Sequence, residues 1–238
     1  MAKVGIIVFP GSNCDRDVFH VLNDVVKLRT EYLWHTTESI EKFDAIILPG
    51  GFSYGDRLRA GIIAAHSPIV KQIKKLSEKG LPVLGICNGF QILVECGLLP
   101  GALLMNRGLQ FICKWTQIEV LNSGTPFTIK FKRGDIIDIP VAHGEGRYAI
   151  DDDTYREVNK NNQIVFKYKK DNFNGSIESI AGISNKCGNI LGIMPHPERA
   201  AEDFLTPFGI QSNAVLIFYS LLEFLKMQDI TKSKDVIY

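Results

Sequence analysis

Short apolar runs alternate with amphipathic segments over the first hundred residues of the chain. Most runs are rich in Val, Ile and Leu and too short for a buried helix, which is typical of strands covered on both faces. Strands are predicted at Val4–Phe9, Glu31–Thr36, Asp44–Leu48 and Pro82–Ile86. The segments between them carry apolar residues at helical spacing, at positions 18, 21, 22, 25 and 26, at 69, 70, 73 and 76, and at 90 and 92–94. This alternation predicts βαβ units and a parallel sheet covered by helices.

The pattern changes after Gly101, where β-like runs follow one another with turn residues between them. These runs cover Gln110–Leu121, Phe127–Phe131, Ile136–Val141, Gln163–Tyr168, Ile177–Ile183 and Ile190–Met194. We expect antiparallel hairpins that extend one edge of the sheet. A last helix is predicted from about Asn213 to Lys226, and the polar tail over 228–238 is expected to be mobile. The pattern predicts one α/β domain over residues 1–227, with a mostly parallel central sheet flanked by helices and an antiparallel β extension.

One cysteine lies at the junction between a predicted strand and a predicted helix. The sequence Gly85-Ile86-Cys87-Asn88-Gly89 has the G-x-C-x-G spacing of a nucleophile elbow, where glycines on both sides permit a sharp strand-to-helix turn. A sulfur at such a turn lies over the first turn of a helix, where free N–H groups favour a thiolate. Buried cysteines are common in ordinary turns, but the paired glycines favour a nucleophile.

A base for this cysteine is found near the end of the chain, in Met194-Pro195-His196-Pro197-Glu198. The two prolines predict an extended backbone, in which His196 and Glu198 face the same way. An imidazole beside a carboxylate can take the proton of a thiol and return it to a leaving amine. A surface turn with an ion pair would give the same local sequence. His143, which has Glu145 two residues away, is the competing base, and the sequence alone does not exclude it.

Gly50-Gly51 ends the third predicted strand. Ligands of parallel sheets bind beyond the carboxyl ends of the strands, so we expect these glycines to lie near Cys87, where their backbone N–H groups can approach a reacting carbonyl. The backbone amide of Asn88 is placed for the same purpose. Without the cysteine, a plain turn would explain the glycines. Cys14 also follows a strand but lacks the flanking glycine, so we interpret it as a small packing residue.

The composition argues against several other functions. Lys and Arg total 27 against 26 Asp and Glu, a net charge of +1, so nothing attracts nucleic acid. Five cysteines without C-x-x-C spacing argue against a disulfide framework and a zinc site, and a reducing cytoplasm fits them best. No metal is expected. The first apolar run is too short for a signal peptide or a membrane span. No phosphate-binding glycine motif follows a strand, so no nucleotide cofactor is predicted in this chain.

These motifs resemble the class I (triad) glutamine amidotransferases, and more closely the glutaminase subunits (PurQ type) of phosphoribosylformylglycinamidine synthases. The matching segments are PGGFSYGDRLRAG (49–61), LGICNGFQILVECGLLPGALLMN (84–106), PVAHGEGRY (140–148), NGSIESIAGI (174–183) and CGNILGIMPHPERA (187–200), which span most of the chain. Arg57 departs from the family pattern, since an aromatic residue is expected there, and Ala60 stands where a cysteine is often found. Neither belongs to the predicted triad.

The resemblance implies a single-domain, flavodoxin-like class I glutaminase fold and roles for individual residues. Cys87 would be the nucleophile, His196 the general base and acid, and Glu198 the carboxylate that orients the imidazole. The other implied site residues are Gly51 and Asn88, whose backbone amides would form an oxyanion hole, and Gln91, His143 and Gly144, which would lie near bound glutamine. This moves His143 from catalysis to binding.

The resemblance also implies partners. Ammonia released from L-glutamine would pass to a large synthase subunit, which uses ATP and Mg²⁺ to convert formylglycinamide ribonucleotide to formylglycinamidine ribonucleotide in purine biosynthesis. A small third protein would bridge the two subunits. No nucleic acid or membrane partner is expected. Two alternatives stay open: a stand-alone cysteine hydrolase of γ-glutamyl or peptide bonds, and a flavodoxin-like binding module without catalysis.

Overall fold

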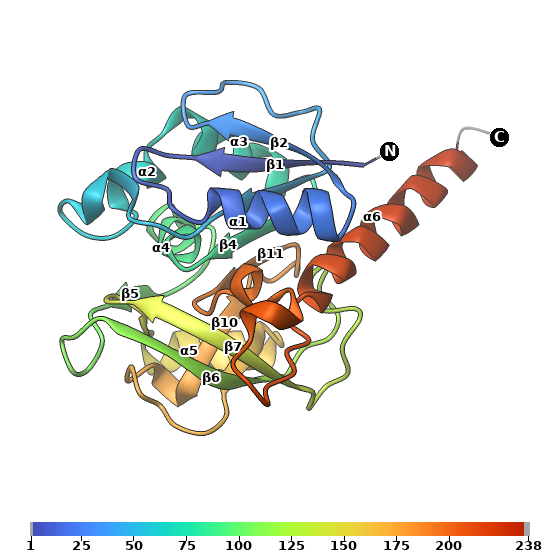
Figure 1. Cartoon of the computed structure of the whole chain (residues 1–238). Coiled ribbons are helices and arrows are strands. Elements are labelled where there is room, and N and C mark those ends of the chain that lie inside the picture. Colours follow the sequence, from blue (N-terminus) through green and yellow to red (C-terminus); the bar gives the residue numbers. More distant parts are fainter. Residues whose placement is uncertain (1, 236–238) are drawn as a thin grey trace.

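The computed structural model describes residues 2–235, which form a nine-stranded central sheet in the order β2-β1-β3-β4-β11-β10-β9-β6-β7 (Figure 1). The strands of its parallel part are β1 (Lys3–Val8), β2 (Arg29–Trp34), β3 (Ala45–Leu48), β4 (Val83–Ile86) and β11 (Ile190–Ile193). β1 pairs with β2 and β3, and β4 pairs with β3 and β11, all in parallel. The carboxyl ends of β3, β4 and β11 therefore lie side by side, although β11 is remote in sequence.

The other half of the sheet is antiparallel. It contains β10 (Ile180–Ser184), β9 (Ile164–Tyr168), β6 (Ile112–Val120) and β7 (Ile136–His143). β10 pairs with β11 and continues the sheet through β9 and β6 to β7 at the edge. A separate antiparallel pair joins β5 (Ala102–Leu104) to β8 (Arg147–Ala149). The predicted α/β fold, with a parallel sheet and an antiparallel extension, is confirmed.

Helices cover the sheet and connect its strands. They are α1 (Asp15–His20), continued by a π-helical turn (Val21–Val25), α2 (Ile62–Ala65), α3 (Pro68–Ser77), α4 (Asn88–Glu95), α5 (Asp152–Lys160) and α6 (Leu216–Asp235). α3 begins at a proline directly after Ser67, as the sequence predicts. α4 packs against β3, β4 and β11. α6 projects away from the body of the molecule toward its C-terminal end (Figure 1).

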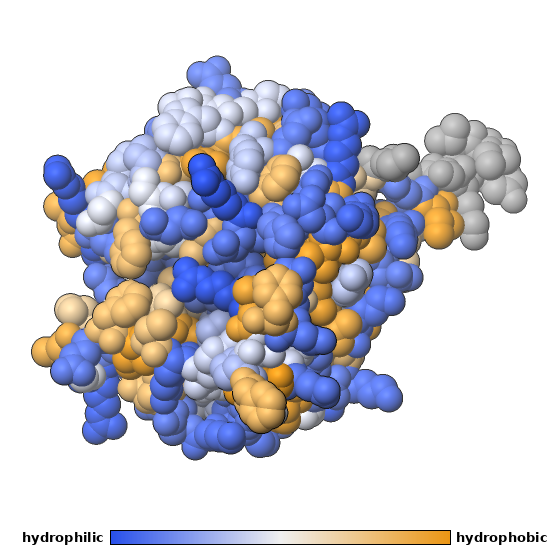
Figure 2. Space-filling model, in the orientation of Figure 1, coloured by the Kyte–Doolittle hydropathy of each residue, from blue (hydrophilic) through white to orange (hydrophobic). Residues whose placement is uncertain are grey.

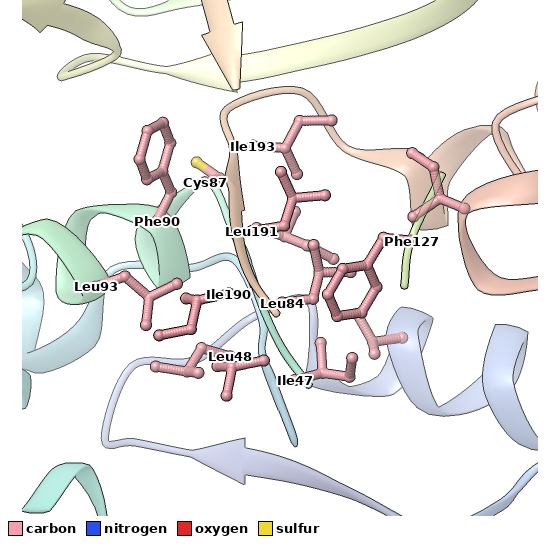
Figure 3. Packing of buried hydrophobic residues seen from close by; sticks show 14 of the residues in the cluster. Ile47, Leu48, Leu84, Cys87, Phe90, Leu93, Phe127, Ile190, Leu191 and Ile193 are labelled. Carbon is pink, nitrogen blue, oxygen red and sulfur yellow. The ribbon is translucent and has the colours of Figure 1, made fainter. Parts of the chain in front are cut away.

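Glycines allow α4 to lie very close to the sheet. A Cβ atom at Gly192 of β11 would overlap the ring of Phe90, and a Cβ atom at Gly89 would overlap the carbonyl group of Leu48. Figure 3 shows Phe90 and Cys87 together at one end of the packed core. This close packing brings the first turn of α4 directly over the end of β4.

Several local predictions differ from the structure. Phe127–Phe131, predicted to be a strand, forms consecutive turns instead, because the backbone and hydroxyl groups of Thr125 and Thr128 hydrogen bond to each other. Both phenylalanines are nevertheless buried, since a spacing of four residues lets both reach the core from a turn. The first part of Ile177–Ile183 is a 3-10 turn rather than a strand.

Two helical segments also differ. The helix α5 was not predicted, because most of its residues are charged or polar and only Val158 is buried. Its start is marked by Asp151, whose side chain accepts a hydrogen bond from the backbone of Thr154. The polar tail expected from residue 228 instead continues α6 as far as Asp235, and 236–238 lie outside the described residues. Within the described part of the chain, no helix is both long and apolar enough to cross a membrane.

Candidate active site

Cys87 occupies a sharp turn between β4 and α4. Its backbone has φ 50° and ψ −104°, a conformation that non-glycine residues rarely adopt. The turn is held by the backbone N–H of Cys87, which donates to Ile193 of β11 at 2.8 Å. A Cβ atom at Gly85 would lie 2.7 Å from the backbone of Gly89, so both flanking glycines are required. The predicted nucleophile elbow is therefore present, and its strain is of the kind stored at functional sites.

His196 and Glu198 form a buried pair beyond the end of β11. Nδ1 of His196 lies 2.6 Å from Oε1 of Glu198, and both side chains are about 99% or more buried. The predicted pairing is present, but the predicted local conformation is wrong. Pro197 begins a 3-10 turn that contains Glu198, because proline is well tolerated at the first position of a helical turn.

The surroundings of His196 favour the protonated form of its imidazole. Burial lowers its pKa, but the charge of Glu198, and after it the charge of Cys87, outweigh burial and raise the pKa well above 6.5. Nδ1 is occupied by Glu198, whereas Nε2 has no close hydrogen-bond partner among the described residues. Nε2 is therefore the nitrogen free to exchange a proton with a thiol and a substrate.

A second cysteine lies beside the same imidazole. Sγ of Cys14 is 4.0 Å from Nδ1 of His196, and Nη2 of Arg199 donates to that sulfur at 2.9 Å. Arg199 also places Nε 3.9 Å from Oε1 of Glu198. The interpretation of Cys14 as a mere packing residue missed these contacts. However, Cys14 faces Nδ1 of His196, which is already hydrogen bonded to Glu198. A nucleophilic thiol would exchange its proton with Nε2, which has no partner among the described residues.

Cys14, His196 and Glu198 place one ligand atom each within 4.8 Å of one another, a spacing that a metal ion could bridge. Two contacts oppose this use. The shared nitrogen of His196 is hydrogen bonded to Glu198, and a guanidinium group, itself a cation, lies on the sulfur of Cys14. The donor set fits a proton-transfer pair better than a metal centre.

His143, the competing base, lies at the end of β7. Nδ1 of its ring is 3.0 Å from Oδ1 of Asn106, an amide rather than a carboxylate. Burial, together with the charge of His196, lowers the pKa of His143 to about 4, so its ring is neutral at neutral pH. Glu145 contacts the backbone N–H of Ala60 at 3.4 Å. These contacts favour His196 as the base.

The segment after β3 is held against the loop after β1. The backbone N–H groups of Asn13 and Cys14 both donate to the carbonyl of Gly50, at 3.3 and 3.1 Å. Gly51 has φ +148°, and a Cβ atom there would lie 2.7 Å from the backbone nitrogen of Asn13. Only glycine fits this position, which borders the same cavity as Cys87.

Side-chain amides connect the walls of this cavity. Oδ1 of Asn88 accepts from the backbone N–H of Ser53 at 3.2 Å, and its Nδ2 donates to Oε1 of Gln91 at 2.8 Å. Nε2 of Gln91 then donates to the carbonyl of Glu145 at 2.7 Å. Both ends of the Gln91 side chain are thus bonded to protein, so its position in the wall of the cavity is fixed.

The cavity beside Cys87 has a volume of about 120 Å³. It is lined by Gly51, Phe52, Asp56, Cys87, Gln91, Met105, Phe111, Ala142, His143, Gly144 and Glu145. Drug-sized ligands occupy pockets of about 300–1,000 Å³, so this cavity suits a much smaller substrate. Its rim is apolar and open, since Phe52, Met105 and Phe111 are about half exposed.

The arrangement brings together the residues that the sequence analysis selected. The charge of Cys87 contributes to the raised pKa of His196, and His196 is paired with Glu198. Gly51, Gln91, His143 and Gly144 line the same cavity as Cys87. Asn88 begins α4 directly after the cysteine. A thiol, an imidazole paired with a carboxylate and an adjacent cavity can perform acyl transfer on an amide.

Comparison with known proteins decides between the families that share such an elbow. Residues 1–225 match the family model of the CobB/CobQ-like glutamine amidotransferase domain. The chain belongs to this family. As a glutamine amidotransferase it is also similar to a chain of the structure of PurLQS from Thermotoga maritima, with 46% identity and a TM-score of 0.85 over 94% of this chain and 99% of that one. The predicted resemblance, including the PurQ type, is confirmed.

Two more distant structures share the glutamine amidotransferase fold. A protein from Thermoplasma acidophilum, described as one of the subunits of a GMP synthase, is 16% identical, with a TM-score of 0.66 over 98% of each chain. A glutamine amidotransferase from Thermotoga maritima is 20% identical, with a TM-score of 0.55 over 84% of this chain and 77% of that one. At these identities the likeness concerns the fold alone.

Two residues near the site were not selected from the sequence. Arg199 directly follows the predicted triad in His196-Pro197-Glu198-Arg199, but a charged residue after a turn gives no sign that it faces inward. Asp56 lies in a segment whose unusual backbone is visible only in the structure: Tyr54, Asp56 and Leu58 all have φ between 52° and 70°. Asp56 borders the cavity beside Cys87.

Proposed function

We propose that this chain is the glutaminase subunit of phosphoribosylformylglycinamidine synthase, with Cys87, His196 and Glu198 as its catalytic triad. The observations that carry the proposal are an elbow cysteine in the wall of a small cavity and a buried imidazole paired with a carboxylate. The segments PGGFSYGD, AHGEGRY and MPHPERA and the 46% identity to a chain of PurLQS support the choice of synthase.

The reaction follows from the placement of these groups. The thiolate of Cys87 attacks the side-chain carbonyl carbon of glutamine, and the backbone amides of Gly51 and Asn88 hold the oxyanion that forms. His196 donates its proton from Nε2 to the departing ammonia, while Glu198 keeps Nδ1 protonated and stabilises the imidazolium. His196 then removes a proton from water, which attacks the thioester and releases glutamate and the free thiol.

The product ammonia requires an acceptor outside this chain. We propose that it passes to a large synthase subunit, which uses ATP and Mg²⁺ to convert formylglycinamide ribonucleotide to the amidine, with a small third protein as a bridge. The apolar rim at Phe52, Met105 and Phe111 supports coverage by a protein, since exposed apolar patches beside a site mark interaction surfaces. Figure 2 shows hydrophobic side chains gathered in patches on one face of the molecule. A cytoplasmic location is supported by five cysteines that are all free.

The division of labour can be tested with Cys87→Ala in the assembled complex. Glutamine-dependent synthesis should be abolished, whereas synthesis supplied with ammonium salts should persist, because the ATP-dependent step is carried out elsewhere. Loss of both activities would contradict the proposal. His196→Ala should likewise remove glutaminase activity with the fold intact, and unchanged turnover would return His143 to consideration as the base.

The same samples separate the two alternatives. A stand-alone hydrolase would be fully active as an isolated chain, whereas a glutaminase subunit should be nearly inactive until the synthase subunit is added. A binding module without catalysis would not react with an electrophilic glutamine analogue at Cys87.

A further inference from the structure

The cavity beside Cys87 carries negative charge without a matching basic residue. Asp56 and Glu145 both border it, and none of the described residues that line it is Lys or Arg. The imidazole of His143 is also part of its wall, but a pKa of about 4 leaves that ring neutral at neutral pH. The cavity therefore favours a ligand that brings a positive charge.

Hydrogen-bond acceptors in this wall lack donors. Oδ1 of Asp56 is buried and makes no hydrogen bond within the described part of the chain. Nε2 of His143, in a side chain that is about 98% buried, also has no partner among the described residues, and since Nδ1 faces the amide oxygen of Asn106, Nε2 is the acceptor nitrogen. Buried acceptors without donors are costly. A ligand that carries several N–H donors would satisfy them.

The position of Asp56 is set by its loop. The backbone N–H of Tyr54 donates to Pro10 at 2.7 Å, and its hydroxyl lies 3.1 Å from Nδ1 of His35. These contacts anchor the segment just before Asp56 to the loop after β1. The carboxyl group is thus held at the cavity instead of being free to turn to solvent.

The titration of Asp56 agrees with this arrangement. Burial and the negative charge of Glu145 raise the pKa of Asp56 to about 6. Asp56 is still mostly ionised at neutral pH, and the positive charge of a cation bound between the two carboxylates would offset both effects by favouring the ionised form.

We propose that Asp56 binds the α-ammonium group of glutamine. This rests on the proposed function: if the amide end of glutamine lies at Cys87, its amino-acid end must occupy the remainder of a cavity of about 120 Å³, which Asp56 and Glu145 border. An ammonium group brings one positive charge and three N–H donors, which match the acceptors left unpaired. Asp56 would then be a specificity residue that selects free glutamine over amides without an α-amino group.

The test compares L-glutamine with 4-carbamoylbutanoate, which has the same amide and carboxylate but no α-amino group. Wild type, Asp56→Asn, Asp56→Glu and the exposed control Asp153→Asn are assayed for ammonia release in the assembled complex. Wild type and Asp153→Asn should prefer glutamine by at least about 10-fold in kcat/KM. Asp56→Asn should lose about 10- to 100-fold of that preference through a higher KM for glutamine, with the analogue unaffected, because one charged hydrogen bond is lost. Asp56→Glu, which keeps the negative charge, should show a preference for glutamine between those of wild type and Asp56→Asn.

The outcomes separate the two proposals. If wild type releases no ammonia from glutamine, the proposed function fails. If wild type is active and Asp56→Asn keeps the full preference for glutamine, or loses activity on both amides equally, the role of Asp56 is overturned. Circular dichroism and the midpoint of urea unfolding verify that the variant is folded. Should it fail to fold, the wild type alone decides, because equal kcat/KM for glutamine and the analogue would contradict an ammonium site.

Discussion

Nδ1 of His196 lies 2.6 Å from Oε1 of Glu198, and neither side chain reaches solvent. A buried carboxylate this close to an imidazole fixes which ring nitrogen carries the proton, and it leaves Nε2 for the reaction. The charge of Glu198 is also the largest of the influences that raise the pKa of His196. Catalysis should therefore depend on this carboxylate even though it never touches the substrate.

Glu198→Gln should lower kcat for glutamine hydrolysis by about 10³- to 10⁴-fold, because an amide neither enforces the tautomer nor stabilises the imidazolium. The pKa of His196 should fall in the same variant. The control is Glu202→Gln, whose carboxylate lies 2.9 Å from Nε2 of His20 and is not hydrogen bonded to His196. Stopped-time assays of glutamate formation measure the effect, and comparable losses in the two variants would show that Glu198 has no special role.

His143 should make the fold sensitive to acid. Its pKa is about 4 in the folded chain and 6.5 in the unfolded one, so the folded state binds the proton less tightly. This difference in pKa has no effect on stability above pH 6.5 and destabilises the fold increasingly as the pH falls toward 4, by up to roughly 3 kcal/mol. Urea unfolding of wild type and His143→Gln between pH 4 and 8 tests this. The stability difference between the two proteins should shift against wild type on acidification, and a constant difference would contradict it.

Gly89→Ala should destabilise the protein by about 1–3 kcal/mol or prevent folding, because the new methyl group would overlap the carbonyl of Leu48 and push α4 away from the sheet. Gly108→Ala is the matched control, since a Cβ atom there meets open space. Urea unfolding compares the two. Equal stability of both variants would mean that the elbow tolerates a wider separation than the structure indicates.

Cys14→Ser should leave glutamine hydrolysis within about 10-fold of wild type. A hydroxyl can still accept a hydrogen bond from Arg199, and Cys14 faces the ring nitrogen that Glu198 occupies. The measurement is kcat for ammonia release in the assembled complex. A loss as deep as that of Cys87→Ala would instead mean that Cys14 takes part in the chemistry.

The sequence allowed the elbow and the His196–Glu198 pair to be predicted because each is encoded by adjacent residues: glycines beside Cys87, and two residues between prolines. The strands of the parallel sheet were predicted for a similar reason, since they are continuous apolar runs. Even so, the pair forms from a 3-10 turn rather than from the extended backbone that was expected.

Features that depend on distant contacts could not be predicted in this way. Cys14 contacts His196, which is 182 residues away in the sequence, and Arg199, which is 185 residues away. Asp56 comes to the cavity only through a loop with three left-handed non-glycine residues. α5 buries one residue and is otherwise mostly charged or polar, so it lacks the apolar positions that mark the other helices. The turns at Phe127–Phe131 bury the same residues that a strand would bury.

The central claim is that Cys87 is the residue that attacks glutamine. The most direct test is to treat the assembled complex with 6-diazo-5-oxo-L-norleucine, an electrophilic glutamine analogue, and to map the adduct by peptide mass spectrometry. We expect one adduct, on Cys87. Excess glutamine should suppress its formation, and the Cys87→Ala variant should not form it. An adduct on Cys14, or labelling that persists in Cys87→Ala, would contradict it.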